Sequence, residues 1–350
     1  MSKSALIDTG GGREGGLPPS RSTLLTRLRN PWPDHRAERM LGAVALFACL
    51  CVLAMIALVA QRAWPIFAHN GLSWLGPGGS LKQQIENMLA TSTNPPASAF
   101  HLRAWPILYG TLLITALAVL LALPLAVLSA VFIVELAPVA LRRVMVRVVR
   151  LLASVPSVIY GLIGVLVLVP FVGNHLVTPS ERASVQDTVQ LTGAGLAVAV
   201  VVLTVMITPI MVALICDALS AVPPAWREGA AALGVNRLRA IRAVTLRAVR
   251  PAIVAATVLA TARALGEAIM ISMVSGSNFF APRLSDGLTF FYEPLRTLAS
   301  TIVDYHEGIG APALSATLYA LALLLLFSAF VLSIAGYLIK LPLRRYQVRG

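Results

Sequence analysis

Long apolar stretches, separated by shorter polar or basic segments, dominate this chain. Six of them approach or exceed the roughly 20 residues that an α-helix needs to cross a bilayer. They cover residues 40–60, 107–134, 148–172, 195–216, 251–274 and 313–339. A helix at the surface of a soluble protein would carry polar residues along one face, and these stretches carry few. The pattern predicts an all-α integral membrane protein with six transmembrane helices.

The segments outside these stretches have a different composition. Residues 1–39 contain glycine, proline and arginine, and we expect a disordered cytoplasmic arm there. Residues 40–60 would form a first anchor helix, and 61–105 an extracytoplasmic loop. Residues 341–350 would form a cytoplasmic tail. The loop contains three residues of a type that is enriched at membrane interfaces, namely Trp64, Trp74 and Trp105.

The basic residues are unevenly distributed. Of the 28 lysines and arginines, 21 lie in the arm, the loop after the second span, the segment 217–250 and the tail. Only six lie in the three remaining loops. Because cytoplasmic loops carry an excess of basic residues, this bias predicts an even number of spans with both termini in the cytoplasm. The expected location is the inner (cytoplasmic) membrane.

Composition and missing motifs exclude several functions. Charged residues are 12% of the chain, about half of the usual share in soluble proteins. The net charge of +13 comes from orientation signals, so we expect no nucleic-acid partner. None of the three lysines follows a glycine, which excludes a P-loop for ATP. The five histidines lie outside the spans and are scattered, so we expect no metal, no cofactor and no enzyme activity in this chain.

One basic segment between the fourth and fifth spans has helix signals at both ends. Pro223 and Pro224 suit a first helical turn, and Glu228 nearby favours the positive end of the helix dipole. Gly234 stands where a glycine often ends a helix, and Asn236 can cap a second helix leading to the fifth span. We expect a short cytoplasmic helix held at both ends. An amphipathic connector facing lipid headgroups would show the same pattern.

Two opposite charges occur inside the fifth span. Arg263 lies near its middle and Glu267 follows four residues later, so on one helix they would share a face and partly neutralise each other. Charges at this depth are costly, and such residues are candidates for a transport path. Arg263 could hold an oxyanion with two parallel hydrogen bonds. The alternative is a buried ion pair that only orients helices.

Several motifs together resemble a known family. The sequence EGAAALG, which contains Glu228, Gly229, Ala230 and Gly234, resembles the EAA loop of ABC importer permeases. Gly229 replaces the usual first alanine of that motif, and Arg247 stands where the family often has proline. PSVIYG in the third span supplies Pro156, Ser157, Tyr160 and Gly161. With Gly110-Thr111 in the second span and RALGE at 263–267, these motifs resemble phosphate permeases of the PstC type.

The resemblance covers about residues 105–340 and implies several expectations. The fold would be that of a type I ABC importer permease, with the permease domain at 106–340 and the coupling segment at 217–250. The expected partners are a homologous PstA-type permease, PstB-type ATPase subunits that hydrolyse ATP, and an extracytoplasmic phosphate-binding protein. The expected substrate is phosphate.

The sequence leaves alternatives to this reading open. The chain could be the sister permease, or a permease for sulfate or molybdate. It could also be an ion-coupled secondary transporter, although no inverted repeat is evident. A purely structural membrane subunit would not need a charge pair at midspan.

Overall fold

The computed structural model describes residues 34–76, 81–90, 96, 100–185, 190–279 and 281–343. The chain divides into two compact units, residues 1–57 and 58–350. In the first unit the described residues belong to a single helix, α2 (Asp34–Asn70), which continues into the second unit.

The ends of the chain differ in part from the expectation. Residues 34–39 of the expected disordered arm are helical, because α2 begins at Asp34. Residues 341–343 of the expected tail belong to the last helix. The remainder of the arm and of the tail lies outside the described residues.

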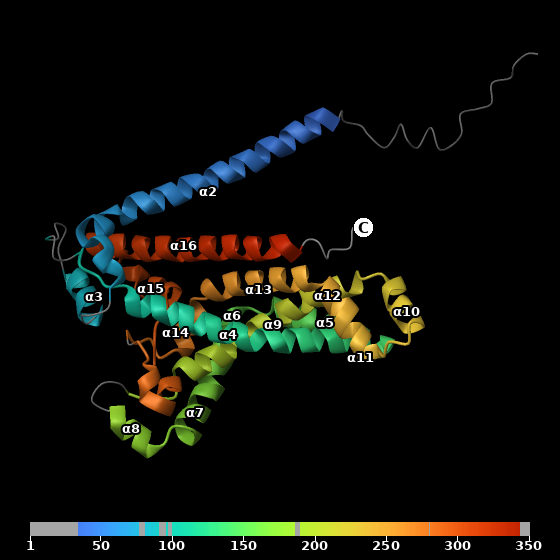
Figure 1. Ribbon diagram of the computed structural model, residues 1–350. Coiled ribbons are helices and arrows are strands. Elements are labelled where there is room, and N and C mark those ends of the chain that lie inside the picture. The colour runs from blue at the N-terminus through green and yellow to red at the C-terminus, as the bar shows by residue number, and fades with distance from the viewer. Residues whose placement is uncertain are drawn as a thin grey trace, which may run out of the picture. The chain divides into compact units, whose positions relative to one another are not determined.

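The second unit is built from helices and short helical turns (Figure 1). After α2 come η1 (Gly71–Leu75), α3 (Leu81–Ala90), α4 (Trp105–Val131), η3 (Phe132–Leu136), α5 (Val139–Ser154), α6 (Ser157–Ile163), η4 (Gly164–Leu168), α7 (Val169–His175), α8 (Pro179–Val185) and α9 (Leu196–Ser220). The rest are α10 (Pro224–Ala232), α11 (Arg237–Ala240), η5 (Ile241–Thr245), α12 (Leu246–Ala248), α13 (Arg250–Leu265), α14 (Ile269–Val274), η6 (Leu284–Phe291), α15 (Leu298–Asp304), η7 (His306–Gly310) and α16 (Pro312–Leu343). Among the described residues the only β pairing is an isolated bridge between Gly276 and Leu295.

The membrane-crossing segments agree with the all-α, multi-span prediction. Within the described residues five helices are long and apolar enough to span: Ala37–Asn70, Trp105–Leu136, Ser157–His175, Leu196–Ser220 and Pro312–Pro342. A sixth span is reached when Arg237–Ala248 and Arg250–Leu265, which meet at a bend of 64°, are counted together. Many leucines on these helices are exposed, as a lipid-facing surface requires.

The third span is shorter than the sequence pattern indicated. It begins at Ser157 instead of residue 148, because Pro156 forces the preceding Val155 into an extended conformation. Residues 139–154 form the separate helix α5, which has no buried residue and contains four arginines. The prediction failed here because the apolar face of this amphipathic helix merged with the following span.

The fifth span is divided where the sequence predicted one continuous helix. α13 ends at Leu265 and α14 begins at Ile269. Gly266 and Ala268 both stay in the right-handed helical region, and Ala268, at φ −110° and ψ −57°, lies away from the usual values of an α-helix. The break places the RALGE motif at the junction of two helices.

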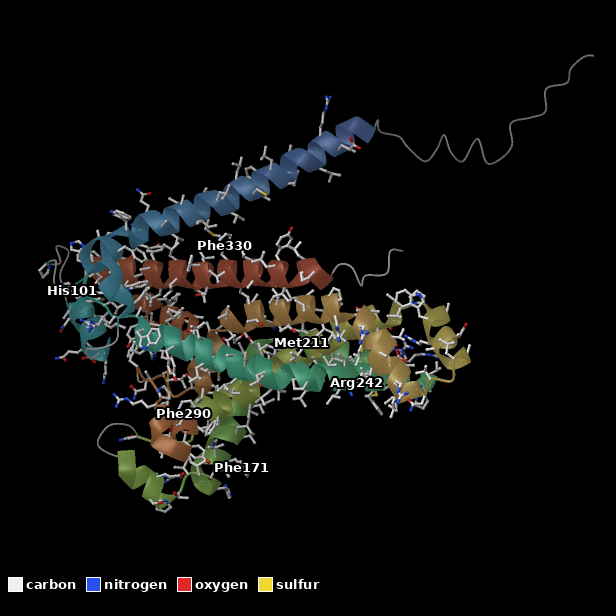
Figure 2. All side chains as sticks on the ribbon, viewed as in Figure 1. His101, Phe171, Met211, Arg242, Phe290 and Phe330 are labelled. Carbon is white, nitrogen blue, oxygen red and sulfur yellow. The ribbon has the colours of Figure 1, made fainter. Side chains whose placement is uncertain are left out.

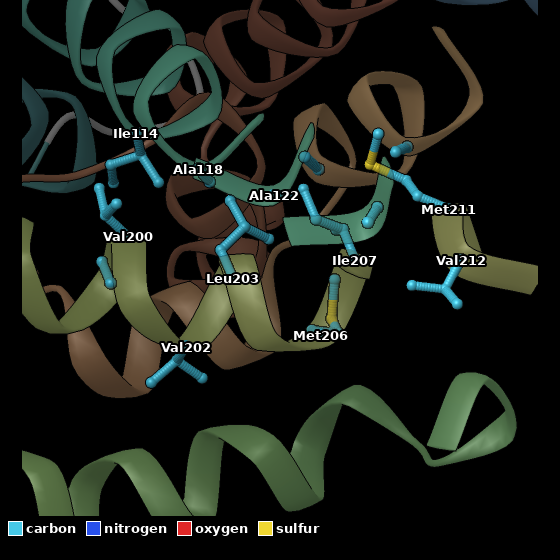
Figure 3. Close-up of a cluster of buried hydrophobic side chains, with 14 of the residues drawn as sticks. Ile114, Ala118, Ala122, Val200, Val202, Leu203, Met206, Ile207, Met211 and Val212 are labelled. Atoms are coloured by element: carbon cyan, nitrogen blue, oxygen red, sulfur yellow. The ribbon is translucent and has the colours of Figure 1, made fainter. Parts of the chain in front are cut away.

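The core of the second unit is the contact between α4 and α9. Every fourth residue of α4 is fully buried there: Ile114, Ala118, Ala122, Ala126 and Ala130. Figure 3 shows Ile114, Ala118 and Ala122 beside Val200, Leu203 and Ile207 of α9. Alanine has so small a side chain that the two backbones approach closely, and the Thr204 hydroxyl donates to the Ala118 carbonyl at 3.3 Å. Fifteen of the 25 residues of α9 are buried, which makes it the central helix.

A buried segment crosses the opposite end of the unit from α10. We call residues 292–296 the strap; it lies against three glycines, Gly110, Gly195 and Gly276. A Cβ atom at any of them would come within about 2.5 Å of a strap atom, closer than van der Waals contact allows. Backbone bonds fix the strap, from Leu196 to the Glu293 carbonyl (3.1 Å) and from Leu295 to the Ser275 carbonyl (2.9 Å).

The loop at 61–105 is more ordered than the prediction implied. It contains the end of α2, η1 and α3, and Trp74 is 2% exposed in an apolar cluster with Ile66 and Met88. Trp74 is therefore covered by the protein and does not itself face the lipid. Trp64, which is 68% exposed, and Trp105, which is 40% exposed, remain compatible with the predicted membrane interface.

We expect Ala122→Leu to destabilise the protein by about 1–3 kcal/mol, because a larger side chain must separate α4 from α9. Ala116→Leu is the matched control, since Ala116 lies on the exposed face of the same helix. Thermal unfolding of both variants in detergent would measure the difference. Equal melting temperatures for the two variants would contradict the close α4–α9 contact.

Candidate functional site

The segment 223–236 forms the expected short helix with well-defined ends. Pro223 caps α10 and Pro224 is its first residue. At the other end the amide of Gly234 donates to the Ala231 carbonyl (2.9 Å) and the amide of Val235 to the Ala230 carbonyl (3.1 Å). These two bonds form a Schellman motif, and Gly234 has the positive φ (+74°) that the motif needs. Asn236 caps the next helix through the Arg239 amide at 2.8 Å.

α10 is fixed on one side and exposed on the other. Ala230 is buried, and Arg227 donates to the Leu219 carbonyl at the end of α9 (3.1 Å). Glu228 and Gly229 face outward, and a Cβ on Gly229 would meet no atom within 4 Å. Two large apolar side chains are also exposed, Trp226 at 42% and Leu233 at 84%. We call Trp226, Glu228, Gly229 and Leu233 the outer face of α10.

This end of the unit also gathers the basic side chains. Arg242 lies there, and His101 lies at the opposite end (Figure 2). Arg142 of α5 donates to the Ser220 hydroxyl (2.8 Å), and Arg150 pairs with Asp217 at 3.0 Å. The charge bias predicts that this end is cytoplasmic.

Glu135 is a site residue that the sequence reasoning missed. It lies in η3, at the end of the second span, and its side chain is 6% exposed. Its carboxylate is 3.0 Å from the guanidinium of Arg227 on α10, and Arg237 donates to its backbone carbonyl. The available signal was a lone carboxylate in an apolar run, two residues before a helix-starting Ala-Pro. The distribution of lysine and arginine, which predicts the orientation of the spans, carries no information about this acidic residue.

The predicted pairing of Arg263 with Glu267 is not found. The helix that would place them on one face ends at Leu265, between the two residues. Glu267 accepts from the Met270 amide at 3.3 Å, and none of the ion pairs among the described residues joins it to Arg263. Arg263 is exposed on the surface of the single chain, although it lies midway through a span.

The PSVIYG motif packs against the broken fifth span. A Cβ on Gly161 would lie 3.1 Å from the Met270 Cα and 2.9 Å from the Met273 sulfur, so glycine permits the contact between α6 and α14. The Tyr160 hydroxyl donates to the Leu152 carbonyl at the end of α5 at 3.0 Å. Pro156 is the N-cap and Ser157 the first residue of α6, the helix that carries Tyr160 and Gly161. The structure thus packs PSVIYG against α14, the segment that follows RALGE.

The Gly110-Thr111 pair contacts the strap region. The Thr111 hydroxyl donates to the Ile107 carbonyl (2.7 Å) and accepts from the Leu298 amide (2.9 Å). Beside it Arg296 is buried, pairs with Asp304 at 3.1 Å, and lies over the rings of Phe279 and Tyr305. A motif at the start of the second span therefore fixes the end of the unit opposite α10.

Comparison with known proteins assigns the fold to a family. Residues 122–340 match the family described as the binding-protein-dependent transport system inner membrane component. The chain belongs to this family. The matched residues include α10, Glu135, the PSVIYG helix and the broken fifth span, so the candidate sites are all parts of a transport permease.

Individual relatives of the permease cover most of its length. It is 31% identical to a probable ABC transporter permease protein, YqgH, of Bacillus subtilis, over 75% of this chain and 78% of the relative. It is 31% identical to the probable phosphate transport system permease protein PstC of Methanocaldococcus jannaschii, over 72% and 79% of the two chains. The corresponding protein of Haemophilus influenzae is 29% identical, over 93% and 100%.

We expect Gly234→Ala to weaken the C-terminal cap of α10 by about 1–2 kcal/mol, because alanine is strained at positive φ. Gly229→Ala is the matched control: both sites have open space, but Gly229 lies within the helix, where alanine is favoured. Hydrogen–deuterium exchange of peptides covering 224–235 would measure the effect. Faster exchange in Gly229→Ala than in Gly234→Ala would contradict the role assigned to the cap.

Proposed function

We propose that this permease is the membrane subunit of an ATP-driven importer of inorganic phosphate in the inner (cytoplasmic) membrane. It would act with a homologous permease, two ATPase subunits that hydrolyse ATP, and an extracytoplasmic phosphate-binding protein. The family membership and the relatives named as phosphate transport permeases support this assignment. An ion-coupled secondary transporter does not fit a binding-protein-dependent family.

The observation that carries the proposal is the outer face of α10. Apolar side chains that are exposed together outside the membrane often mark a protein-binding surface, and this face carries both Trp226 and Leu233. A short helix with a proline start and a Schellman end, anchored by Arg227, presents this face in a defined orientation. We infer that it docks on the ATPase subunit, and that Glu228, Gly229, Ala230 and Gly234 form the coupling element. Closure of the ATPase pair would then move α10.

The exposure of Arg263 supports a path between two permeases. A guanidinium facing hydrocarbon near midspan costs several kcal/mol, so this surface is better explained as one that a second permease or a water-filled path covers. Because the helix is broken between them, Arg263 does not pair with Glu267. The Arg263 guanidinium can then form two parallel hydrogen bonds to phosphate oxygens. We assign Arg263 to the substrate path, and Glu267, four residues further along the chain, to the same path.

We expect Leu233→Asp to reduce the affinity for the ATPase subunit by about tenfold or more, because truncating a buried interface anchor typically costs 2 kcal/mol or more. Arg239→Ala, which changes an exposed charge on α11, is the control. Co-purification from detergent would measure the retained ATPase. Full retention by Leu233→Asp would place docking elsewhere.

We expect Arg263→Ala to abolish phosphate uptake in an assembled transporter, and Arg263→Lys to retain part of it. Lysine keeps the charge but cannot form two parallel bonds to an oxyanion. Arg62→Ala, at an exposed arginine of α2, is the control. Radiolabelled uptake in proteoliposomes would measure each variant.

Competition by sulfate and molybdate in the same uptake assay tests the anion. Phosphate alone should compete with labelled phosphate. Wild-type uptake by both Arg263 variants would make the residue structural, and equal competition by the other oxyanions would favour a different substrate.

A further inference from the structure

A buried ion pair connects α10 to the end of the second span. Glu135 of η3 lies 3.0 Å from Arg227, and the side chains are 6% and 33% exposed. Arg237, on the helix after α10, donates to the carbonyl of the same Glu135. One arginine within α10 and one just after it therefore both contact Glu135 at the end of the second span.

The geometry of this pair is poorly suited to adding stability. Neither the Glu135 Oε1 nor the Arg227 Nε has a hydrogen-bond partner, so the contact is an ion pair without a well-aligned hydrogen bond. Buried pairs with unsatisfied atoms gain little over apolar replacements, because desolvation offsets the attraction. A role in positioning explains the pair better than a role in stability does.

The turn that carries Glu135 is a π turn, like η4 and η5. Proline at 138 cannot continue the helix, and η3 closes with a bond from the Ala137 amide to the Phe132 carbonyl, five residues back (2.8 Å). Single π turns of this kind are often found at functional sites. This one places the carboxylate at the edge of a cavity of about 410 Å³, lined also by Arg142, Arg227 and Arg237. The cavity gives α10 room to shift relative to the span.

The span that Glu135 terminates reaches the other end of the unit. α4 is packed along α9 through its alanines, and at its start Gly110 and Thr111 contact the strap and the residues after it. A displacement at Glu135 would therefore be carried by a closely packed helix to the strap. No comparable buried ion pair among the described residues joins α10 to another span.

We propose that Glu135 is a positioning residue that latches α10 to the second span, so that motion of α10 on ATP binding is transmitted along α4. This inference rests on the proposed coupling role of α10. It goes beyond that role by naming the contact through which α10 moves the membrane helices.

The test uses the complete transporter in proteoliposomes and measures both phosphate uptake and ATP hydrolysis. Glu135→Gln keeps the shape of the side chain but leaves Arg227 without its charge partner. We expect phosphate transported per ATP hydrolysed to fall about tenfold, within the range of typical coupling between sites. Asp217→Asn is the matched control, because the Arg150–Asp217 pair has the same 3.0 Å distance but both side chains are 62% exposed. It should leave the ratio unchanged.

A double variant separates positioning from folding. Glu135→Gln with Arg227→Gln leaves no unpaired buried charge, so the transporter should assemble at the wild-type level. Its transport ratio should remain as low as that of Glu135→Gln. A wild-type ratio in the double variant would overturn the latch.

A distance measurement tests the latch independently of transport. Spin labels at Ala232 on α10 and Leu128 on α4, both exposed, would be introduced after the three native cysteines are replaced. The distance distribution should be narrow with Glu135 and broad with Glu135→Gln. Identical distributions would refute the latch even if the chain transports phosphate, whereas a wild-type transporter that moves no phosphate would refute the proposed function alone.

Discussion

The close approach of α4 and α9 is the constraint on which the rest of this structure depends. Four alanines spaced four residues apart leave no side chain large enough to separate the two backbones. In a bilayer the hydrophobic effect does not hold helices together, so close packing must. The contact makes α9 the centre of the unit and makes α4 a stiff element. Both ends of α4 then meet irregular backbone, the strap at one end and the η3 turn at the other.

Polar contacts are concentrated at these two ends. Glu135 pairs with Arg227 of α10 at one end, and the buried Arg296 of the strap pairs with the more exposed Asp304 at the other. Between them α4 and α9 supply almost only apolar atoms and hydroxyls bonded to their own helices. These paired charged side chains therefore lie where backbone polar groups and water can partly solvate them, which lowers the desolvation penalty. If the proposed latch moves α4, the motion would therefore be transmitted through packing and not through a chain of charges.

The broken fifth span shows where sequence periodicity stops being informative. A continuous apolar run from 251 to 274 indicates a span, but the pattern contains nothing that fixes a break at Gly266. After the break, Met270 of α14 packs against Gly161 of α6. Spacing of four residues between Arg263 and Glu267 predicted a pair, and the interrupted helix removed it.

The sequence by itself determined the all-α class, most of the spans, and the α10 turn with its proline start, Gly234 and Asn236 cap. These features follow from local rules: apolar run length, backbone conformation, and caps that involve residues a few positions apart. Only the tertiary structure decided the place of Glu135 beside Arg227, the burial of Trp74 and the strap among three glycines. Each depends on contacts between residues far apart in the chain, or on which face of a helix is covered, and neither is encoded in local periodicity.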